Sequence, residues 1–375
     1  MLSRDLLCDN KMISAYKFRL YPNKIQETMM YRHLWLSKNL WNELLAFSKI
    51  HYQNYGLFPT KRTLQLMSKN YGIYSQTQRS ISHRVSDSIM RVFKLRKKGI
   101  ECGFPRFKSI ERMKSLYYPQ ATQGFNLETK LKVTLFGEIS IKQHRNIKGD
   151  IKTLSLKREP TGKWYAIFTA ERDAKVKKNR GKAVGIDLGL KTFAILSNGK
   201  IVDNPHHLRE QEDKLAFLQR NLSMCKKGSE NRKKARYKVA LLYEKIANTR
   251  KDFLHKLSHS LVSRYSKIAM EQLASQKMSE GVLGKHINDA GWSMFANMIR
   301  YKAEEAGSEA VFVDPKYTTQ ECSKCGTRSK KELCDRRHEC SSCGLSMDRD
   351  LNAARVILNR ATVGHIGCNV CGVGI

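Results

Sequence analysis

Apolar and polar residues alternate from Ile13 to Tyr21 (ISAYKFRLY), which predicts a β-strand that ends at Pro22. From Lys24 to about Lys98 the apolar residues recur at helical spacing instead, so this stretch is predicted to be a helical block. The apolar positions that carry the helical period are Leu34, Leu40, Trp41, Leu44, Leu45, Ile81, Val85, Ile89 and Val92.

The sequence Gly103 to Lys108 (GFPRFK) ends the helical block, and short apolar runs separated by glycines follow it. These runs predict β-hairpins. The expected strands are Leu131–Val133, Ile139–Ile141, Ile151–Leu156 and Trp164–Ala170. Together with the first strand they fit a small β-barrel that the helical block interrupts. The charged run Arg172 to Lys182 then predicts a linker.

Beyond this linker strands alternate with helices, which predicts an α/β sheet. Ala183 to Ile195 is predicted to form a strand, a turn and a second strand. A long basic helical stretch runs from Glu210 to Arg264 and bends at Gly228. Three further elements are expected: a strand at Lys267–Met270, a helix at Trp292–Gly307 and a strand at Ala310–Val313.

The charge changes the picture most. The 375 residues include 69 Lys and Arg against 34 Asp and Glu, a net charge of +35. Such an excess repels itself unless a polyanion neutralises it. A membrane surface is one candidate, and a merely solvated surface is another. The basic residues are spread along the chain instead of forming one amphipathic face, which favours nucleic acid.

Candidate nucleic-acid contacts are the polar and basic residues of the helical block, of the GFPRFK stretch and of the long basic helix. They are Lys61, Gln76, Gln78, Arg79, Arg106, Lys108, Lys233, Lys234, Arg236 and Arg250. For any one of them a solvated helix face is the competing interpretation.

A hydrophobic fraction of 41% excludes wholesale disorder, and the length allows two or three domains. No apolar run reaches the roughly 18 residues that span a bilayer. Met1 to Asn10 lacks the hydrophobic region of a signal peptide. We therefore expect a cytoplasmic, nucleoid-associated protein with no membrane partner.

Three acidic residues lie where predicted strands end or a helix begins. Asp187 lies between an apolar run and a glycine, Glu271 directly follows the strand KIAM, and Asp350 precedes an apolar helix face. Burying a carboxylate is costly unless it is paired or binds a cation. Three carboxylates that converge would suit two Mg²⁺ ions, or Mn²⁺ in their place. Two such ions about 3.5–4 Å apart can catalyse the hydrolysis of a phosphodiester bond.

Each acid taken alone has a simpler interpretation. Asp187 could belong to a turn or a phosphate loop, and Asp350 could cap a helix. Asp348 competes with Asp350 for the metal, although its place in the turn favours a capping role. The three acids in this order and these contexts favour a metal site.

Ten cysteines in a cytosolic chain indicate metal before disulfides. Cys322, Cys325, Cys340 and Cys343 form two CxxCG knuckles, whose four thiolates predict one structural Zn²⁺ ion without an open coordination position. Cys334 and His338 lie between or beside the knuckles and are less suited as ligands, and Cys368 with Cys371 lacks a second pair. Because the ribbon precedes Asp350, zinc is expected to help place that carboxylate.

These residues resemble the TnpB (OrfB) proteins of insertion sequences, which are related to type V CRISPR effectors. The matching stretches cover nearly the whole chain from about Ile13. They include AYKFRLYPNKIQ, GFPRFK, GIDLGLKTFAILSNGK, IAMEQLASQKM, DAGWSMFANMIRYKAEEAG, YTTQECSKCG, HECSSCG and DRDLNAAR.

The resemblance implies an α/β multidomain protein with an RNase H-like (RuvC) nuclease core, in which Asp187, Glu271 and Asp350 bind the catalytic metal. It implies a split wedge barrel with a helical recognition insert, and a zinc ribbon inserted in the core. The expected partners are a guide RNA from the transposon end and a double-stranded DNA target beside a short adjacent motif. A monomer with one RNA is expected.

The corresponding domain boundaries are an N-terminal extension (1–11), the first wedge segment (12–25), the recognition domain (26–102), the second wedge segment (103–180), the first RuvC segment (181–317), the zinc ribbon (318–346), and the second RuvC segment with the tail (347–375).

Three alternatives remain at the level of the sequence. A repressor would keep guided DNA binding without cleavage, but relatives of that kind are expected to lose a metal acid. An actin-like ATPase would share GIDLG but needs a second glycine-rich loop where the zinc ribbon lies. A transposase of the HUH type needs a His-hydrophobe-His pair, and His206-His207 lacks the intervening residue.

Overall fold

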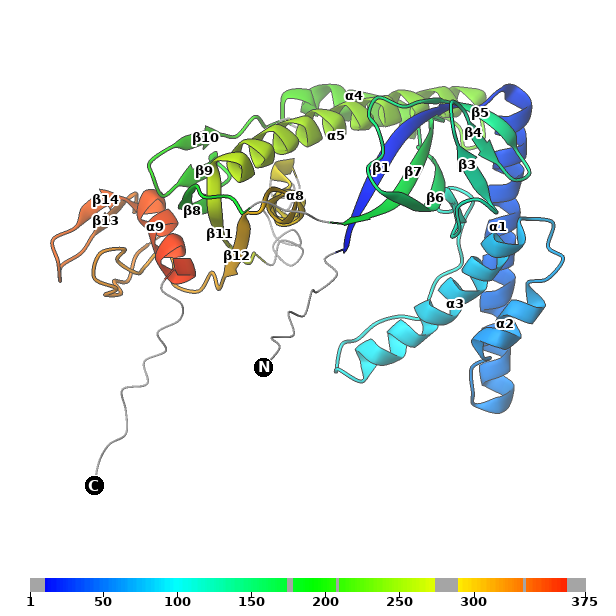
Figure 1. Ribbon diagram of the computed structural model, residues 1–375, viewed down its shortest axis with the longest axis horizontal. Helices are drawn as coiled ribbons and strands as arrows, with labels where there is room; N and C mark the ends of the chain where they lie inside the picture. The colour runs from blue at the N-terminus through cyan, green and yellow to red at the C-terminus, as the bar shows by residue number, and fades with distance from the viewer. Residues whose placement is uncertain (1–10, 174–177, 207–208, 274–288, 333–334, 363–375) are drawn as a thin grey trace, which may run out of the picture. The chain divides into compact units, whose positions relative to one another are not determined.

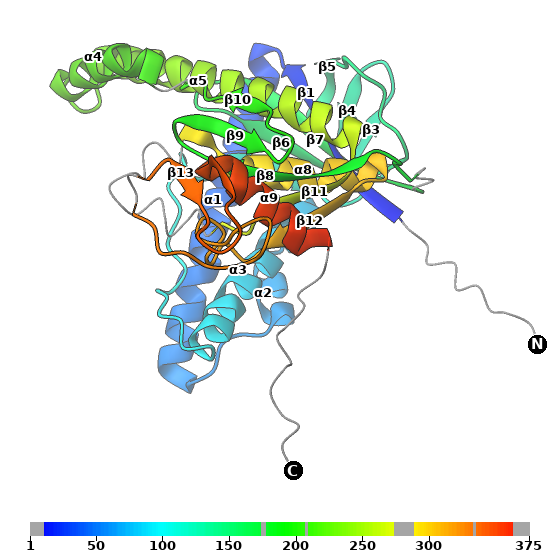
Figure 2. The ribbon, with the colours of Figure 1, turned by 90° about the vertical axis from the view of Figure 1, so that its left-hand side faces the viewer.

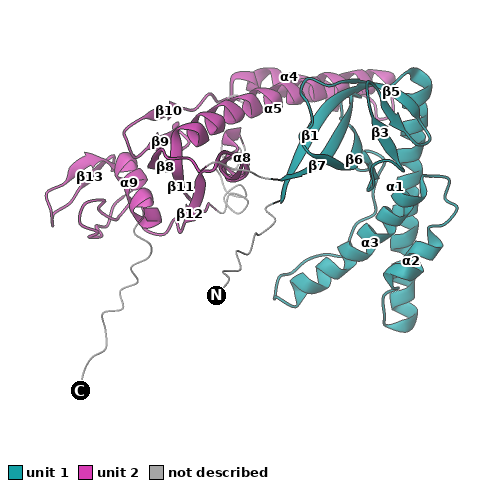
Figure 3. Ribbon diagram, viewed as in Figure 1, with its two compact units in different colours: residues 1–174 teal, residues 175–375 magenta. Residues whose placement is uncertain are grey.

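A computed structural model describes residues 11–173, 178–206, 209–273, 289–332 and 335–362. It forms two compact units, Met1–Ala174 and Lys175–Ile375 (Figure 3). Each unit has its own hydrophobic core. Among the described helices, none combines the length and the apolar character that crossing a membrane would require.

The first unit contains a seven-stranded antiparallel sheet in the order β2-β6-β7-β1-β5-β4-β3. The strands are β1 (Lys11–Tyr21), β2 (Ser115–Tyr118), β3 (Phe125–Leu127), β4 (Leu131–Val133), β5 (Gly137–Lys142), β6 (Asp150–Arg158) and β7 (Trp164–Asp173). The first strand lies at the centre and pairs with β7 and β5. The sheet curls around a core that includes Phe18, Phe125 and Phe168, so the predicted barrel is present as a nearly closed sheet (Figure 1).

Three helices are inserted between β1 and β2: α1 (Lys24–Tyr55), α2 (Lys61–Met67) and α3 (Ser75–Arg96). Asn23 and Gln26 form a reciprocal capping box that begins α1, and Gly56, with a φ of 68°, ends it. Leu34, Leu44 and Leu45 are buried, as the helical period predicted.

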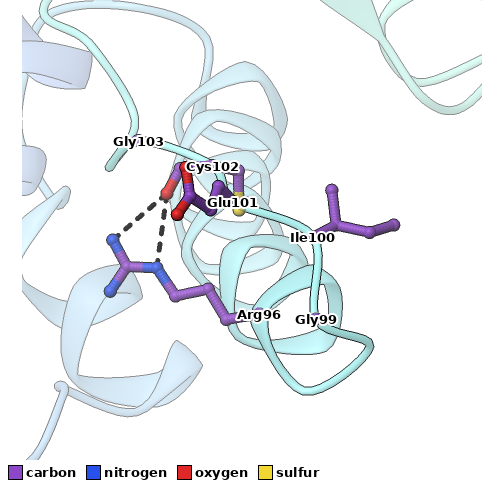
Figure 4. A pocket seen from close by; sticks show the side chains of 6 residues that line it. All are labelled: Arg96, Gly99, Ile100, Glu101, Cys102 and Gly103. Carbon is purple, nitrogen blue, oxygen red and sulfur yellow. Dashed lines mark hydrogen bonds between the residues drawn. The ribbon is translucent and has the colours of Figure 1, made fainter.

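The end of α3 borders a hollow of about 700 Å³ that is lined by Arg96 and residues 99–103 (Figure 4). The Arg96 guanidinium donates two hydrogen bonds, of 3.1 and 3.3 Å, to the carbonyl oxygen of Cys102. Arg96 therefore stabilises the turn that follows the helix. We assign this hollow a structural role.

The second unit contains a five-stranded sheet in the order β10-β9-β8-β11-β12. The strands are β8 (Lys182–Leu188), β9 (Thr192–Leu196), β10 (Ile201–Asp203), β11 (Tyr265–Glu271) and β12 (Glu309–Val313). β8, β11 and β12 run parallel, whereas β9 is antiparallel to both of its neighbours.

Helices cover both faces of this sheet (Figure 2). The covering helices are α5 (Glu230–Arg264), α8 (Trp292–Ala306) and α9 (Arg349–Thr362). The short 3₁₀ helix η1 (Arg209–Gln211) leads into α4 (Glu212–Met224), which packs on α5. α5 and α8 pack on the face that carries Ile186 and Ile268, and α9 packs on the face that carries Ala269. A separate hairpin of β13 (Arg337–Glu339) and β14 (Ser346–Asp348) leads directly into α9.

The longer elements predicted from the sequence are all present, and the break at Gly228 is a glycine with a φ of 87° between α4 and α5. The sequence patterns missed β2, β3, β10, β13 and β14, which have only three or four residues each. Such short strands contain few positions that could establish an alternation, although β4, with three residues, is predicted between its flanking glycines.

Gly185 in the middle of β8 fixes the distance between the sheet and α9. A Cβ atom at this position would lie 2.1 Å from the carbonyl oxygen of Ala354 and 2.8 Å from the amide nitrogen of Leu358. Both contacts are with the α9 backbone, which cannot rotate away as a side chain can. Only glycine therefore permits this close packing.

We predict that Gly185→Ala destabilises the second unit by about 1–3 kcal/mol, because the added methyl group forces α9 away from β8. Amide hydrogen exchange should accelerate in α9. The control is Gly103→Ala, since a Cβ at Gly103 meets no atom within 4 Å and its φ is not positive. Wild-type exchange in α9 of the Gly185 variant would contradict the prediction.

Candidate active site

Asp187 and Glu271 lie side by side on neighbouring parallel strands. In the register of β8 with β11, Gly185 pairs with Ala269 and Ile186 pairs with Met270. Side chains alternate between the faces of a strand. Ile186 and Met270 belong to the core under α5 and α8, so Asp187 and Glu271 lie on the opposite face, which α9 covers.

Asp350 lies in the first turn of α9. The Oδ1 atom of Asp348 accepts hydrogen bonds from the backbone N–H groups of Asp350 and Leu351, both at 3.0 Å. Asp348 therefore caps the helix, as its sequence position suggested, and the side chain of Asp350 is not used for capping.

The three carboxylates interact electrostatically. Burial raises the pKa of Asp187 well above its usual value, and the negative charges of Glu271 and Asp350 raise it further, while Arg349 opposes them. Burial also raises the pKa of Glu271, against a hydrogen bond from Thr318 and the charge of Arg360. The structure therefore brings the three predicted acids into one site, where their charges oppose one another.

Two of the acids accept a hydrogen bond from a neighbouring side chain. The Thr318 hydroxyl donates to the Oε1 atom of Glu271 at 2.5 Å, and Arg349 Nε donates to the Oδ1 atom of Asp350 at 3.1 Å. Among the described residues, the four cysteines form the only cluster of three or more potential ligands whose atoms all lie within 4.8 Å of one another. The carboxylates therefore share a site without forming a closed cage.

A hollow of about 310 Å³ opens beside Glu271, between the ends of β11 and β12 and the helix α8. Its polar lining consists of Glu271, Gln272, Ser293, Asn297 and Arg300. The Arg300 guanidinium lies 4.5 Å from the Phe312 ring centroid and donates to Asn297 Oδ1 at 2.9 Å. Ligands of α/β sheets commonly bind at this end of parallel strands, so the hollow gives a substrate access to Glu271.

The four predicted zinc ligands converge. Sγ of Cys322 lies 3.6 Å from that of Cys343, and Sγ of Cys325 lies 3.5 Å from that of Cys340. Four thiols at this spacing fit a tetrahedral zinc ion with Zn–S bonds of about 2.3 Å. Gly326 and Gly344, with φ of 77° and 70°, complete the two knuckle turns.

Of the other cysteine and histidine candidates, His338 lies within the described residues. His338 is buried, contacts Lys331 through Nδ1 and is not among the clustered ligands. Cys334, Cys368 and Cys371 lie outside the described residues.

Asn352, two residues after Asp350, joins α9 to the first zinc knuckle. Its buried side chain accepts from the Ser323 N–H at 3.0 Å and donates to the Glu321 carbonyl at 2.7 Å. Arg360, two turns further along α9, donates to the carbonyl oxygens of Asp314 and Lys316, both at 2.9 Å. These bonds fix the segment that carries Thr318, so ribbon, α9 and Glu271 form one bonded assembly.

The ten predicted nucleic-acid contacts differ in their exposure and in their partners within the protein. Arg79, Arg106, Lys233, Lys234 and Arg236 are exposed, as is Lys61, which forms a 2.6 Å ion pair with Asp87; Lys108 and Gln76 are half-buried. Gln76, Gln78 and Arg250 have partners within the protein. The Gln76 amide donates to the side-chain oxygens of Gln120 at 2.5 Å and Gln123 at 2.9 Å. Gln78 is 8% exposed and donates to the Ile73 carbonyl, and Arg250 pairs with Asp289 at 2.7 Å. All ten remain predictions.

Sequence reasoning missed Thr318, Asn352 and the residues around Arg300. Thr318 and Asn352 lie inside the family-like stretches YTTQECSKCG and DRDLNAAR, but neither residue was assigned a role. No pattern along the chain shows that Thr318 meets Glu271, since 47 residues separate them.

Three family models match the chain. A probable transposase model, OrfB_IS605, covers residues 166–281, a Cas12f1-like TNB domain covers 292–357, and a helix-turn-helix domain covers 12–72. A protein of Streptomyces pristinaespiralis, "Putative RNA-guided DNA endonuclease", is 30% identical over 96% of this chain and 91% of its own length. The chain belongs to the TnpB family.

Further relatives agree with the TnpB assignment. InsQ of Escherichia coli K12, which carries the same description, is 27% identical over 95% of this chain and 93% of its own length. The CRISPR-associated endodeoxyribonuclease Cas12f1 of Sulfoacidibacillus thermotolerans is 24% identical over 84% and 86%. A solved complex of Cas12f1 with sgRNA and target DNA matches with a TM-score of 0.64 at 14% identity, covering 94% of this chain and 99% of that one, so the fold is shared.

We predict that Asp187→Asn stabilises the metal-free protein at neutral pH. The raised pKa of Asp187 means that the folded protein binds a proton that the unfolded chain releases near pH 3.8. Wild-type stability should therefore fall as the pH rises above that value, until the folded carboxyl is ionised. Asp187→Asn should remove this fall and raise the melting temperature by a few degrees.

The measurement is a series of thermal melts at different pH values in chelator, with Asp203→Asn as control. Asp203 is an exposed acid in β10 of the same sheet. Mg²⁺ should raise the melting temperature of the wild type more than that of Asp187→Asn. Parallel pH curves for the wild type and Asp187→Asn would refute the repulsion at this site.

We predict that Asn352→Ala loosens both the zinc ribbon and the first turn of α9. It leaves the Ser323 N–H and the Glu321 carbonyl without their partner, at about 1–3 kcal/mol per buried group. Asn359→Ala is the control, because exposed Asn359 donates to the Ser323 carbonyl and water can replace it. Zinc retention in a chelator titration and hydrogen exchange at residues 349–352 should change only in Asn352→Ala.

Proposed function

We propose that this TnpB protein is an RNA-guided endonuclease that hydrolyses phosphodiester bonds of double-stranded DNA next to a short adjacent motif. The observation that carries the proposal is the convergence of Asp187, Glu271 and Asp350 on one face of the second-unit sheet. The full-length similarity to proteins described as RNA-guided DNA endonucleases supplies the substrate and the guide. The mixed sheet, with an antiparallel hairpin beside three parallel strands, supports an RNase H-like (RuvC) core.

The proposed cofactors are two Mg²⁺ or Mn²⁺ ions at the three acids and one structural Zn²⁺ ion at the four cysteines. The donors fit: the acids offer hard oxygen atoms with unrelieved repulsion, and the cysteines offer four thiols in a cluster. Divalent ions bound at the acids would activate water and stabilise the leaving 3′ oxygen.

The residues of the chain set the geometry of the reaction. Asp187 and Glu271 are fixed by strand pairing, and Asp350 is fixed by the capped first turn of α9. Thr318 holds one oxygen of Glu271, which leaves Oε2 for a ligand. Arg300, held by Phe312 and Asn297 at the neighbouring hollow, can receive a phosphate of the strand to be cut.

The partners proposed are a guide RNA from the transposon end and the DNA target. A net charge of +35 suits the contacts to many phosphates that a guide scaffold and a heteroduplex both require. In RNA-guided recognition base pairing supplies the sequence specificity, so the protein needs few base contacts. The order of the proposed wedge, recognition, RuvC and zinc-ribbon domains follows the boundaries given above.

The second candidate function is a guided DNA-binding protein that does not cut. All three acids are present and share one site, which favours cleavage. An actin-like ATPase is disfavoured, since the segment where it needs a second phosphate loop holds the cysteine cluster.

We predict that Asp187→Ala, Glu271→Ala and Asp350→Ala each reduce cleavage below detection while guide and target binding stay within a few-fold of the wild type. Metal coordination, and not folding or phosphate contact, is lost in each variant. The purified complex with its guide RNA is assayed with matched DNA and Mg²⁺, by gel for cleavage and by filter binding for affinity.

Asp348→Ala is the matched control for Asp350→Ala, since Asp348 caps α9 two residues earlier. It should lower stability by about 1 kcal/mol and retain cleavage. Cutting by Asp350→Ala, or loss of cutting only in Asp348→Ala, would exchange the roles of the two acids. A wild-type complex that binds matched DNA and never nicks it would establish the non-cutting alternative.

A further inference from the structure

A cationic pocket of about 540 Å³ lies in the first unit, between α1, α3 and the loop that follows residue 105. Trp41 forms one wall, and Arg84, Arg91, Arg106, Lys108 and Arg112 also line it. This set belongs to none of the features that the proposed chemistry uses. The pocket is therefore a candidate for a separate binding site.

Among the described residues, no acid forms an ion pair with Arg84 or Lys108, the two cations beside Trp41. The one acid in its lining, Asp87, forms a 2.6 Å ion pair with Lys61. Within the described part of the chain, neither Arg84 nor Lys108 has a carboxylate within 4.0 Å. Burial lowers the pKa of Lys108 to about 8, with a further contribution from the charge of Arg84, and burial also lowers the pKa of Arg84.

The cations are held in place before any ligand arrives. The Asn42 side chain accepts from the Lys108 N–H at 2.8 Å and donates to the Lys108 carbonyl at 3.0 Å. The Lys108 ammonium lies 3.1 Å from the ring centroid of Trp41, which is 5% exposed. The Arg84 guanidinium lies 6.0 Å from the same ring. Trp41 thus provides a platform on which two like charges are fixed near each other.

Two fixed cations with no paired acid repel each other, which lowers the stability of the folded protein. An anion bound between them would remove this repulsion. A phosphate fits best, because arginine offers a planar fork of donors and lysine a point charge, the two modes by which proteins bind phosphate. The pocket is lined by exposed arginines on both sides, so a continuing polyanion is better suited than a single small ion.

We propose that the pocket formed by Trp41, Arg84 and Lys108 binds a backbone phosphodiester group of nucleic acid. The contact is independent of base sequence. It deepens the proposed function, on which it rests for the presence of nucleic acid, and RNA and DNA are the two possible sources of the same phosphate.

The first test is a footprint on the full-length wild-type chain. An amine-acetylating reagent is applied to the RNA-free protein, to the protein with a short RNA duplex and to the protein with a DNA duplex of the same sequence. Mass spectrometry then follows Lys108. Its lowered pKa makes it reactive in the free protein, and a bound phosphate should reduce its acetylation at least several-fold.

The second test compares two double variants with equal loss of charge. Arg84→Gln with Lys108→Met removes the pocket cations. Arg145→Gln with Lys142→Met is the matched control, since both residues are exposed in the same unit and Arg145 also lies over an aromatic ring, 4.8 Å from Tyr16. Loss of one or two phosphate contacts should lower the salt slope of the binding constant by about 0.7–1.8 in the pocket variant. The control should change it less.

Protection of Lys108 by RNA alone identifies an RNA phosphate, protection by DNA alone a DNA phosphate, and protection by both a shared site. No protection by either, or equal salt slopes for the two variants, overturns the proposal. The footprint needs no variant, so misfolding of a variant cannot obscure it. Cleavage by a wild-type complex in which Lys108 stays unprotected would refute this site alone, and protection without cleavage would refute only the nuclease.

Discussion

The close approach of α9 to β8 at Gly185 is the constraint on which the candidate site depends. Side chains on β8 that face α9 occupy positions 183, 185 and 187, so the strand that meets the helix at Gly185 presents Asp187 two residues later. Register with β11 then adds Glu271. A larger residue at Gly185 would lift the helix, and with it Asp350, away from the other two acids. The absence of one methyl group at Gly185 therefore allows α9, and Asp350 with it, to lie close to the strand that carries Asp187.

The zinc ribbon acts as a brace for this arrangement. Thiol clustering fixes the knuckles, Asn352 bonds the first knuckle to α9, and Arg360 bonds α9 to the segment that carries Thr318. Thr318 links this segment back to the site, because its hydroxyl donates a hydrogen bond to Glu271. The acids repel one another when no cation is present. Rigid support from outside the sheet is therefore needed to keep them together.

The sequence predicts those candidate residues whose role can be inferred from their immediate neighbours in the chain. Asp187 stands beside a glycine turn, Glu271 ends an apolar run, and the cysteines have ligand spacing. Sequence reasoning could not find Thr318, because a threonine in a loop gains its role only from a partner distant in the chain. It also selected Gln78 and Arg250 as candidate surface contacts, and both have internal partners here. Polarity indicates that a side chain needs a partner, but not whether that partner is the protein or a ligand.

The two units show the same electrostatic principle with opposite signs. In the second unit burial raises the pKa of Asp187, and the charges of the neighbouring carboxylates raise it further. In the first unit burial lowers the pKa of Lys108 over the Trp41 ring, and the charge of Arg84 lowers it further. Each site is destabilising alone and becomes favourable when a ligand of opposite charge binds, so binding free energy and folding free energy are linked. Under the proposed function, the protein would therefore gain stability at each site as metal and nucleic acid bind.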